Sequence, residues 1–374
     1  MNAKLSAFFA FAAALALAAG CSHHPRKGAP QTQAGEPTAP VPSASHARRN
    51  LGNPPGHYSA PYITGDFAGY PALDRFVGQM VAEHGFSRDY LNGLFSQANR
   101  KQWTLNYLAK EPKPHAKPSP GSWTRYRSQF LTERHVSTGA SFWAQHSDAL
   151  RRAEAEYGVS AAHIMGIMGV ETLYGHNVGN HRIIDALTTL AMDYPRRAEY
   201  FSGELENFLV MAQQEGFDPS KPVGSYAGAM GLGQFMPSSF LKYAVDFDGD
   251  GRKNLWEPDD AIGSIANYFS GHGWRSGEPV VTRAKVDGSA PSLESGFEKK
   301  YSLDDLASYG IHPARYFPAE NVRFLRLSAA GGDEYWLGYD NFYVITRYNH
   351  STHYAMAVHQ LAEAVQRRYQ GGGE

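Results

Sequence analysis

The sequence predicts an α+β protein in which helices predominate, and three observations support this class. Between about residues 61 and 275 of the 374-residue chain, apolar residues recur every three or four positions, which is the spacing of amphipathic helices. From about residue 276 to 348 the chain is rich in Gly, Pro and Ser and contains short β-prone runs, which indicates a small antiparallel sheet. The apolar spacing of a helix then returns in residues 350–370.

The first 21 residues have the pattern of an export signal. Lys4 precedes an apolar run over residues 5–19, and the segment "LAAGC" ending at Cys21 is similar to a bacterial lipobox, in which the signal is cleaved and the cysteine is acylated. Simple secretion with cleavage nearby is the alternative. Ser22, which follows the cysteine, favours an anchor at the periplasmic face of the outer membrane of a Gram-negative bacterium. Cys21 is the only cysteine, so a lipidated protein would have no disulfide and would depend on its core or on a metal.

Residues 22–60 are rich in Pro, Ala, Ser, Gly and His and show no apolar period, which predicts a disordered tether. A random coil of this length spans roughly 35 Å. Such a tether would carry a folded domain from a membrane surface to a nearby polymer.

Helices are expected in order along the folded part. The first covers residues 73–81, and the second follows Ser87, whose side chain suits the N-cap position. Further helical patterns cover residues 140–155, 160–173, 183–192, 203–214, 238–245 and 259–270. The β-prone runs are residues 279–286, 322–328, 334–339 and 342–348. Polar turns separate these short runs, so we expect them to form the antiparallel sheet.

Composition and charge exclude some classes of function. The formal net charge is −1 and the pI is near 7.0, so the chain lacks the basic excess that a nucleic-acid partner would require. Aromatic residues make up 13% of the chain, which suits a groove that stacks on flat or weakly polar ligands. Most of these residues would nevertheless be ordinary members of the core.

Glu171 interrupts an apolar stripe in the segment "AAHIMGIMGVETLYG", residues 161–175. Ile164, Ile167 and Met168 fall at helical spacing, and Glu171 takes the next position of that series. Burial disfavours the charged form of a carboxyl group, so the pKa of Glu171 should rise, as a general acid requires near neutral pH. A structural glutamate paired with Arg or with backbone donors is the alternative, and the helix alone does not decide between them.

The segment "GSYAGAMGLGQFMPSSF", residues 224–240, combines small and neutral polar residues. Its glycines allow another chain or a ligand to approach the backbone closely. Ser225, Gln234 and Ser238 supply neutral hydrogen-bonding groups, which suit a carbohydrate better than a phosphate. A simple turn is the alternative.

The segment "DFDGDGRKNLWEPDD", residues 246–260, begins like an EF-hand calcium loop. We expect the carboxylates of Asp246, Asp248 and Asp250 and the backbone carbonyl of Arg252 to bind Ca²⁺. The standard closing position would be Glu257, but Pro258 suits the first position of a helix and would start the exit helix late. We therefore favour Asp260 as the closing ligand and keep Glu257 as the alternative. A metal-free Asx-rich turn also remains open.

Paired arginines and a late polar cluster offer further binding groups. Arg196 and Arg197 lie between two tyrosines, where they could hold an acidic, bulky ligand or could simply start a solvated helix. The segment "TRYNHSTHYAMAV" contains two histidines, but it has no third ligand nearby and the H-E-x-x-H motif is absent, so we discount zinc. Asn349 and Tyr354 of this segment could instead line a groove.

Taken together, these segments resemble the membrane-bound lytic murein transglycosylase B family. The motifs that carry the resemblance occur in family order across about residues 65–368, and they are "GVETLYG", "YPRRAEYFSGELENFL", "GAMGLGQFMPSSF", "DFDGDGRKNLWEP", "DAIGSIANYF", "HGW" and "FYVITRYNHSTHYAMAV". The resemblance implies a lysozyme-like core, a helical domain, a small β domain and one calcium site in an unusually long EF-hand-like loop. The expected domains are a lipoprotein signal peptide (1–21), the tether (22–60), a helical domain (61–145) joined by the C-terminal helix (350–370), the catalytic core (146–275) and the β domain (276–348).

The resemblance also implies an activity. The substrate would be peptidoglycan, cut between N-acetylmuramic acid and N-acetylglucosamine with formation of a 1,6-anhydromuramic acid end, and Glu171 would be the catalytic acid and then the base. The groove residues implied are Tyr126, Arg196, Arg197, Tyr200, Ser225, Gln234, Tyr268, Asn349 and Tyr354. Calcium would be structural, the protein a monomer, and its partners the glycan strands and, through Cys21, the membrane. A hydrolytic muramidase and a non-catalytic peptidoglycan-binding lipoprotein are the alternatives.

Overall fold

The computed structural model describes residues 52–110, 119–288 and 292–371. The predicted signal peptide with Cys21, and residues 22–51 of the predicted tether, lie outside the described residues. Within the described ranges, no helix combines the length and the apolar character that crossing a membrane requires.

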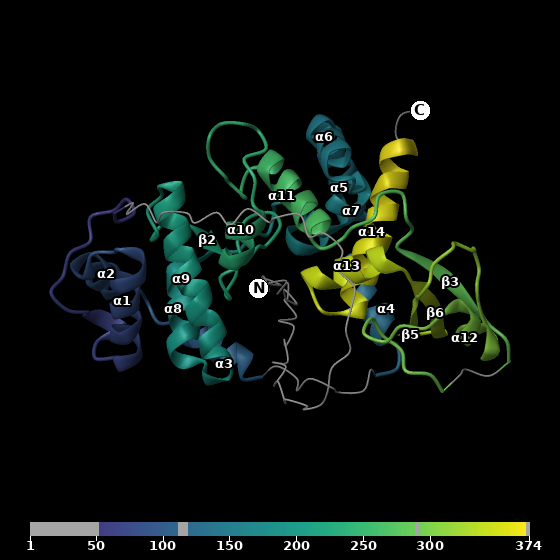
Figure 1. Cartoon of the computed structure of the whole chain (residues 1–374), viewed down its shortest axis with the longest axis horizontal. Helices are drawn as coiled ribbons and strands as arrows, with labels where there is room; N and C mark the ends of the chain where they lie inside the picture. The colour runs from purple at the N-terminus through teal and green to yellow at the C-terminus, as the bar shows by residue number, and fades with distance from the viewer. Residues whose placement is uncertain (1–51, 111–118, 289–291, 372–374) are drawn as a thin grey trace, which may run out of the picture.

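Helices dominate the fold and short strands form a minor part, which confirms the predicted α+β class (Figure 1). The helices are α1 (Pro71–His84), α2 (Arg88–Ser96), α3 (Gln102–Leu108), α4 (Ser122–Arg127), α5 (Glu133–Gln145), α6 (Ser147–Tyr157), α7 (Ala161–Thr172), α8 (Ile183–Asp193), α9 (Ala198–Glu215), α10 (Pro237–Tyr243), α11 (Pro258–Gly271), α12 (Leu303–Ser308), α13 (Asp340–Tyr348) and α14 (Thr352–Gly371). The strands are β1 (His181–Arg182), β2 (Val223–Gly224), β3 (Val281–Val286), β4 (Ile311–Pro313), β5 (Arg323–Ala329) and β6 (Gly332–Gly338).

The central element is α7, which is buried on almost every side. It lies along α14 and also contacts α5, α6 and α11. Gly166 permits the close approach to α14, because a Cβ atom at this position would lie 2.5 Å from the backbone oxygen of Val358. A helix surrounded in this way has no solvent-facing stripe, and Glu171 in its last turn is only partly exposed.

The segment 61–145, predicted as one helical domain, is divided between two places (Figure 1). Helices α1 and α2 pack together at one end of the molecule, where α1 contacts α9. Helix α4 instead contacts β5, and α5 packs along α14. The packing of α5 along α14 agrees with the predicted union with the C-terminal helix, whereas α1 and α2 pack apart from it.

The last residues of the predicted tether are ordered. Tyr58 donates hydrogen bonds to Asp218 Oδ1 at 2.6 Å and to Ser220 Oγ at 2.7 Å. The backbone nitrogen of Ala60 donates to the oxygen of Asp89 at 3.0 Å. The prediction of disorder is wrong for residues 52–60, because one aromatic side chain supplies contacts that the surrounding polar composition did not reveal.

The four-stranded sheet is antiparallel, with strand order β4-β3-β6-β5. Strands β5 and β6 form a hairpin whose register pairs Ala329 with Gly332. A separate apolar cluster lies beside this sheet and includes Leu306, Phe324 and Leu337. A second, two-stranded sheet pairs β1 with β2, which the sequence did not indicate, and it brings residue 181 beside the glycine-rich segment.

The run 342–348, predicted as a strand, belongs to helix α13. Its buried residues include Phe342, Ile345 and Thr346, and this spacing matches a helix. Tertiary packing overrides the β propensity of the run, and Asp340 in the first turn favours helix formation. The helical conformation places Tyr348 at the end of α13, close to the site described below.

Candidate active site

Glu171 lies in the last turn of α7. Its side chain keeps partial contact with solvent, yet burial of the carboxyl group raises its pKa to about 7, which confirms the predicted direction. The hydroxyl group of Tyr354 donates a hydrogen bond to Glu171 Oε1 at 2.5 Å and opposes part of that rise. The result is a carboxyl group that can hold or release a proton near neutral pH.

Three tyrosines surround this carboxyl group, and they come from three different helices. They are Tyr126 of α4, Tyr348 of α13 and Tyr354 of α14. Burial raises the pKa of each phenol, and the nearby charge of Glu171 raises it further. The phenols therefore remain protonated beside Glu171, and the hydroxyl groups of Tyr348 and Tyr354 donate hydrogen bonds.

The backbone turns sharply directly after Glu171. Leu173 and Tyr174 have φ angles of 50° and 56°, in the left-handed region that non-glycine residues rarely adopt. Thr172 holds this turn in place, because its hydroxyl group donates to the oxygen of Leu232 at 2.9 Å and accepts from the nitrogen of Gly175 at 3.0 Å. The end of α7 is thereby fixed to the glycine-rich segment.

The glycine-rich segment is attached to the site from the other side as well. The hydroxyl group of Tyr348 donates to the oxygen of Gly233 at 2.5 Å. Gln234 adopts a φ angle of 52°, and its amide nitrogen donates to the oxygen of Gly231 at 3.0 Å. Ser225 Oγ accepts from the backbone nitrogen of Ala229 at 3.0 Å, which leaves the hydroxyl hydrogen available as a donor. Ser225 and Gln234 thus shape the segment and keep polar atoms for a ligand.

A line of aromatic rings continues from the carboxyl group. The rings of Tyr348 and Tyr268 are 4.8 Å apart, and the hydroxyl group of Tyr268 donates to the oxygen of Arg347 at 2.7 Å. Tyr200 is close enough to affect the pKa of Tyr268, and the guanidinium carbon of Arg197 lies 4.1 Å from the centre of the Tyr200 ring. The structure therefore brings Glu171 and most of the predicted groove residues into one surface.

Two buried polar atoms of the predicted groove residues lack a hydrogen-bond partner among the described residues. They are Nη1 of Arg197 and Oδ1 of Asn349, and both are buried. A buried donor and a buried acceptor without partners suit a ligand that supplies the missing hydrogen bonds. Arg196 differs, because its side chain is exposed and the structure joins it to none of the groups above.

Tyr348 and Glu204 were not singled out from the sequence. Tyr348 directly precedes Asn349 in a quoted motif, which was the available signal, but its run was interpreted as a strand. Glu204 lies on the buried side of α9 among Phe201, Leu205 and Phe208, a spacing that could have marked it as Glu171 was marked on α7. Its carboxylate accepts hydrogen bonds from Ser238 Oγ at 2.6 Å and Ser238 N at 2.9 Å.

The buried carboxyl groups of Asp185, Glu204 and Asp260 have structural partners, and those of Asp260 are described below. Asp185 accepts from Arg182 Nη2 at 2.7 Å and lies 2.8 Å from Lys101 Nζ. Glu204 joins α9 to α10 through Ser238. Among the described residues, no hydrogen bond or ion pair joins these groups to Glu171, whose own partner is the hydroxyl group of Tyr354, so Glu171 is the candidate for proton transfer.

The acidic segment 246–260 gathers two groups of carboxylates. Oxygen atoms of Asp246, Asp248 and Asp260 lie within 4.8 Å of one another, and so do oxygen atoms of Asp248, Asp250 and Glu257. Helix α11 begins at Pro258, as predicted, with Glu257 at the N-cap position. Such a concentration of negative oxygen ligands fits a hard divalent cation, and both candidate closing residues are within reach.

Asp260 also holds the acidic segment together. Its Oδ1 accepts from the nitrogen of Phe247 at 2.6 Å, and its Oδ2 accepts from the nitrogen of Asn254 at 2.6 Å. Asp246 accepts similar bonds from Gly249 and Gly251 at 2.8 and 2.9 Å. The loop is therefore preshaped by its own carboxylates, and the two oxygens of Asp246, which accept one hydrogen bond each, retain lone pairs for a cation.

Comparisons with known proteins agree on one family. The family model described as "Transglycosylase SLT domain" matches residues 69–363. The chain is similar to membrane-bound lytic murein transglycosylase B of Escherichia coli K12, with 52% identity over 308 residues, which cover 80% of this chain and 84% of that protein.

Solved structures show the same relationship. The Escherichia coli lytic transglycosylase Slt35, determined in complex with bulgecin A and in complex with calcium, superposes with a TM-score of 0.78 at 51% identity, covering 83% of this chain and 97% of that one. SltB3 of Pseudomonas aeruginosa, determined in complex with NAG-NAM-pentapeptide, superposes with a TM-score of 0.69 at 30% identity, covering 80% and 79% of the two chains.

Proposed function

Since the chain belongs to the lytic murein transglycosylases of the SLT family, we propose that Glu171 carries out their reaction here, first as the general acid and then as the base. The protein is a peptidoglycan lytic transglycosylase: it cleaves the β-1,4 bond between N-acetylmuramic acid and N-acetylglucosamine and leaves a 1,6-anhydromuramic acid end. The proposal concerns the residues that perform this reaction and those that hold the substrate.

The observation that carries the proposal is the carboxyl group of Glu171, whose pKa of about 7 lets it hold a proton at neutral pH. Glycosidases that use water or a protein nucleophile usually have two carboxyl groups on either side of the bond. The other buried carboxyl groups of the described chain have structural partners, so a mechanism with one acid fits this site best.

In the first step, Glu171 donates its proton to the oxygen of the leaving sugar. The N-acetyl carbonyl of the muramyl residue can stabilise the positive charge that forms at C1, as in substrate-assisted glycosidases. Glu171, now a carboxylate, accepts the proton of the 6-hydroxyl group of the same sugar, and that oxygen attacks C1 and closes the anhydro ring. The nucleophile is intramolecular, so its effective concentration is high compared with that of water.

The tyrosines around Glu171 support this course of reaction. Tyr126 and Tyr348 reduce the space for water beside the carboxyl group, which favours ring closure over hydrolysis. Tyr354 fixes the orientation of Glu171 through its hydrogen bond, so that one oxygen is held while the other is directed to the substrate.

The line from Tyr348 through Tyr268 to Tyr200 is the proposed course of the glycan strand. Its rings can pack on sugar faces, while Ser225, Gln234 and Asn349 supply neutral hydrogen-bonding groups. Arg197, with its unpartnered Nη1, suits an acidic group of a muramyl unit. Because SltB3 was determined with NAG-NAM-pentapeptide, we include peptide-bearing muramyl units among the substrates of this chain. Arg196 would contact only the outer part of such a substrate, since it is exposed.

We further propose one structural calcium ion in the segment 246–260. Its ligands would be Asp246, Asp248, Asp250, the carbonyl of Arg252 and a closing carboxylate, Asp260 or Glu257. The proposal is supported by the convergence of these carboxylates and by the calcium complex of Slt35. Bound calcium would neutralise the repulsion within the segment and fix the start of α11.

Membrane attachment is proposed through an acylated Cys21 at the periplasmic face of the outer membrane. The relative from Escherichia coli is described as membrane-bound, and the lipobox-like segment offers the means of attachment. Metabolic labelling with a fatty-acid analogue should modify the wild-type protein but not the variant Cys21→Ser.

Digestion of purified peptidoglycan with mass analysis of the fragments tests the proposed mechanism. The wild type should release fragments with anhydromuramyl ends, and Glu171→Gln should lose lysis by at least about a hundredfold, the usual contribution of acid–base catalysis. Fragments heavier by one water would instead indicate a hydrolytic muramidase. Undiminished release of anhydro fragments by Glu171→Gln would contradict the role assigned to this residue.

A further inference from the structure

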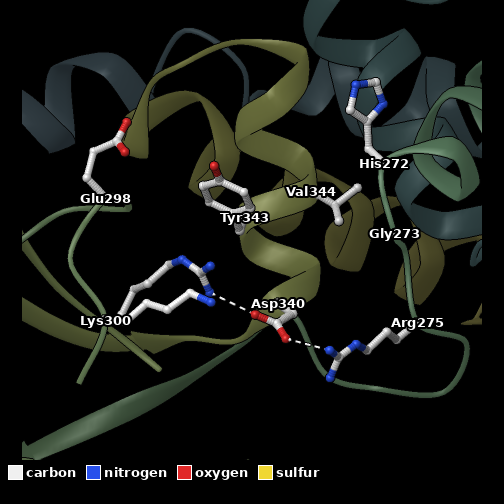
Figure 2. Close-up of a pocket in the computed structure, with 9 residues that line it drawn as sticks. His272, Gly273, Arg275, Glu298, Lys300, Asp340, Tyr343 and Val344 are labelled. Carbon is white, nitrogen blue, oxygen red and sulfur yellow. Dashed lines mark hydrogen bonds and ion pairs between the residues drawn. The ribbon is translucent and has the colours of Figure 1, made fainter. Parts of the chain in front are cut away.

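A cavity of about 270 Å³ lies outside the aromatic line, at the junction of α13 with the four-stranded sheet. It is enclosed by the chain that follows α11, the loop that precedes α12, the start of β5 and the first turns of α13. Figure 2 shows side chains that line it, among them Arg275, Lys300, Asp340 and Tyr343. The mechanism above uses none of these residues.

The charges around this cavity are unequal. Arg275, Lys300 and Arg323 are cationic, and only Glu298 and Asp340 are acidic. Arg323 Nη1 lies 3.2 Å from Asp340 Oδ1, and Arg275 Nη2 lies 3.0 Å from Asp340 Oδ2, so one acid is shared by two guanidinium groups (Figure 2). Arg275 Nη1 also lies 3.6 Å from Glu278 Oε2, so both arginines are paired with acids, and among the described residues Lys300 is the lining cation without an acidic partner.

Lys300 is the least constrained of these cations. Within the described chain its ammonium group takes part in no ion pair or hydrogen bond, and its side chain is exposed. Figure 2 shows it on the same side of the cavity as Glu298 and opposite Arg275. Asp340, paired with Arg275, is drawn between Lys300 and Arg275, so a further anion would contact Lys300, where it need not break an ion pair.

Arg323 makes the floor of the cavity rigid. It is 2% exposed, its Nε donates to the oxygen of Phe297 at 3.0 Å, and its guanidinium carbon lies 4.5 Å from the centre of the Tyr343 ring. A buried guanidinium group is costly unless it is well paired, and these contacts supply the pairing. The cationic surface is thus preformed and does not depend on a ligand to assemble it.

The cavity lies close to the proposed glycan path. His272 lines it, and the His272 ring is 4.1 Å from the ring of Tyr268, which belongs to the aromatic line. Tyr343 also lines the cavity and precedes Tyr348 on the same helix by about one and a half turns. A peptide of three to five residues, fully extended, spans about 10 to 18 Å. Such a peptide could reach the cavity from a muramyl unit held near Glu171.

We propose that this cavity binds a carboxylate of the stem peptide carried by the muramyl unit, with Lys300 as the recognising cation. The inference rests on the proposed function, because it requires the glycan to follow the aromatic line. It extends that function by giving the enzyme a means to prefer peptide-bearing glycan over bare glycan. Charge-assisted contacts with a carboxylate are stronger than neutral ones, so a peptide anion would be selected there.

The test compares two soluble substrates: uncross-linked glycan strands that carry their peptides, and the same strands after an amidase has removed them. For each substrate we measure kcat/KM of the wild type, of Lys300→Gln and of a matched control, Lys299→Gln. Lys299 is the neighbouring lysine, and it does not line the cavity but lies 6.0 Å from the ring of Tyr301. Lys300→Gln should lower the preference for peptide-bearing strands by about fivefold, as for one partly exposed ionic contact, while Lys299→Gln should keep the preference.

Three results would be informative. A preference that Lys300→Gln leaves unchanged, or that Lys299→Gln lowers equally, overturns the proposal for the cavity. A Glu298→Gln variant should increase the preference, because it removes an acidic group from the cavity, and a decrease would also overturn the proposal. If the wild type releases no anhydromuramyl ends from either substrate, the proposed function itself has failed, which separates the two conclusions.

Discussion

The hydroxyl group of Tyr354 lies 2.5 Å from Oε1 of Glu171 and donates a hydrogen bond to it. The two residues are 183 positions apart in the chain, and the bond joins the first turn of α14 to the last turn of α7. Burial raises the pKa of Glu171, and this bond lowers it, so the two effects together give a value of about 7. The C-terminal helix therefore helps to set the proton affinity of a group on the central helix.

Replacing Tyr354 with Phe should shift the pH dependence of lysis to higher pH. The bond favours the ionised carboxylate, so its loss raises the pKa of Glu171 above about 7. Glu171 must be protonated to act as an acid, and activity should fall at a higher pH in Tyr354→Phe than in the wild type. The pH profile of kcat/KM on soluble glycan measures this. If kcat/KM of Tyr354→Phe fell at the same pH as in the wild type or at a lower pH, the proposed effect of Tyr354 on the pKa of Glu171 would be contradicted. This holds even if the variant is slower at every pH.

Glu171→Gln should stabilise the protein in alkaline but not in acidic solution. The folded-state pKa of about 7 lies above the ordinary value of 4.5 for a glutamate. The contribution of this group to stability is therefore full below pH 4.5 and is lost as pH rises through 7. Gln has no proton to lose, and its advantage should reach roughly 3 kcal/mol at most near pH 8. Urea unfolding at pH 4.5 and pH 8 tests this. An equal difference at both pH values would show that the carboxyl group is not perturbed by burial.

Calcium should raise the melting temperature, and Asp260→Asn should weaken this effect. Calcium at about 100 times its Kd would stabilise the folded state by about 2.7 kcal/mol, if one ion binds there. Asp259→Asn is the matched control, because Asp259 belongs to neither group of close carboxylates. Thermal unfolding in calcium and in a chelator, for the wild type and for both variants, measures the binding. A melting temperature that calcium does not change would refute the calcium site.

The melting temperature of Asp260→Asn in the chelator must be measured as well. Asp260 accepts backbone hydrogen bonds from the loop, so the variant should unfold more easily even without calcium. The calcium effect is therefore the difference between the two solutions for each variant, and not the melting temperature itself. Glu257→Gln tests the alternative closing ligand in the same way.

Two glycine substitutions should have opposite effects on stability. At Gly166 of α7, a Cβ would lie 2.5 Å from the oxygen of Val358, so Gly166→Ala should destabilise the fold by about 1 to 3 kcal/mol. At Gly203 of α9, a Cβ would meet nothing within 4 Å, so Gly203→Ala should stabilise by about 0.5 to 1 kcal/mol through helix propensity. Denaturant unfolding compares both with the wild type. If Gly166→Ala were neutral, α7 and α14 could not pack as closely as described.

Patterns within short segments of the sequence predicted much of the fold. The helix around Glu171, the start of α11 at Pro258 and the short strands of the late sheet followed from periodicity and from the preferences of single residues. The run 342–348 was misread because its β-branched residues suit both a strand and a packed helix. Order in residues 52–60 was missed because it depends on partners such as Asp218, far along the chain.

The sequence alone determined which chemical groups are present: an acid at the end of an apolar helix, neutral polar residues among glycines, and carboxylates spaced as in a calcium loop. The tertiary structure decided which of them meet. It brings Tyr126, Tyr348 and Tyr354 around Glu171 and leaves Arg196 apart. It also places Lys300 and Arg275 in the lining of one cavity. The reason is physical. Helix and strand periods are set by residues that are neighbours in the sequence. A shifted pKa or a shared charge depends instead on side chains from distant segments, and only the packing of those segments brings them within a few ångströms.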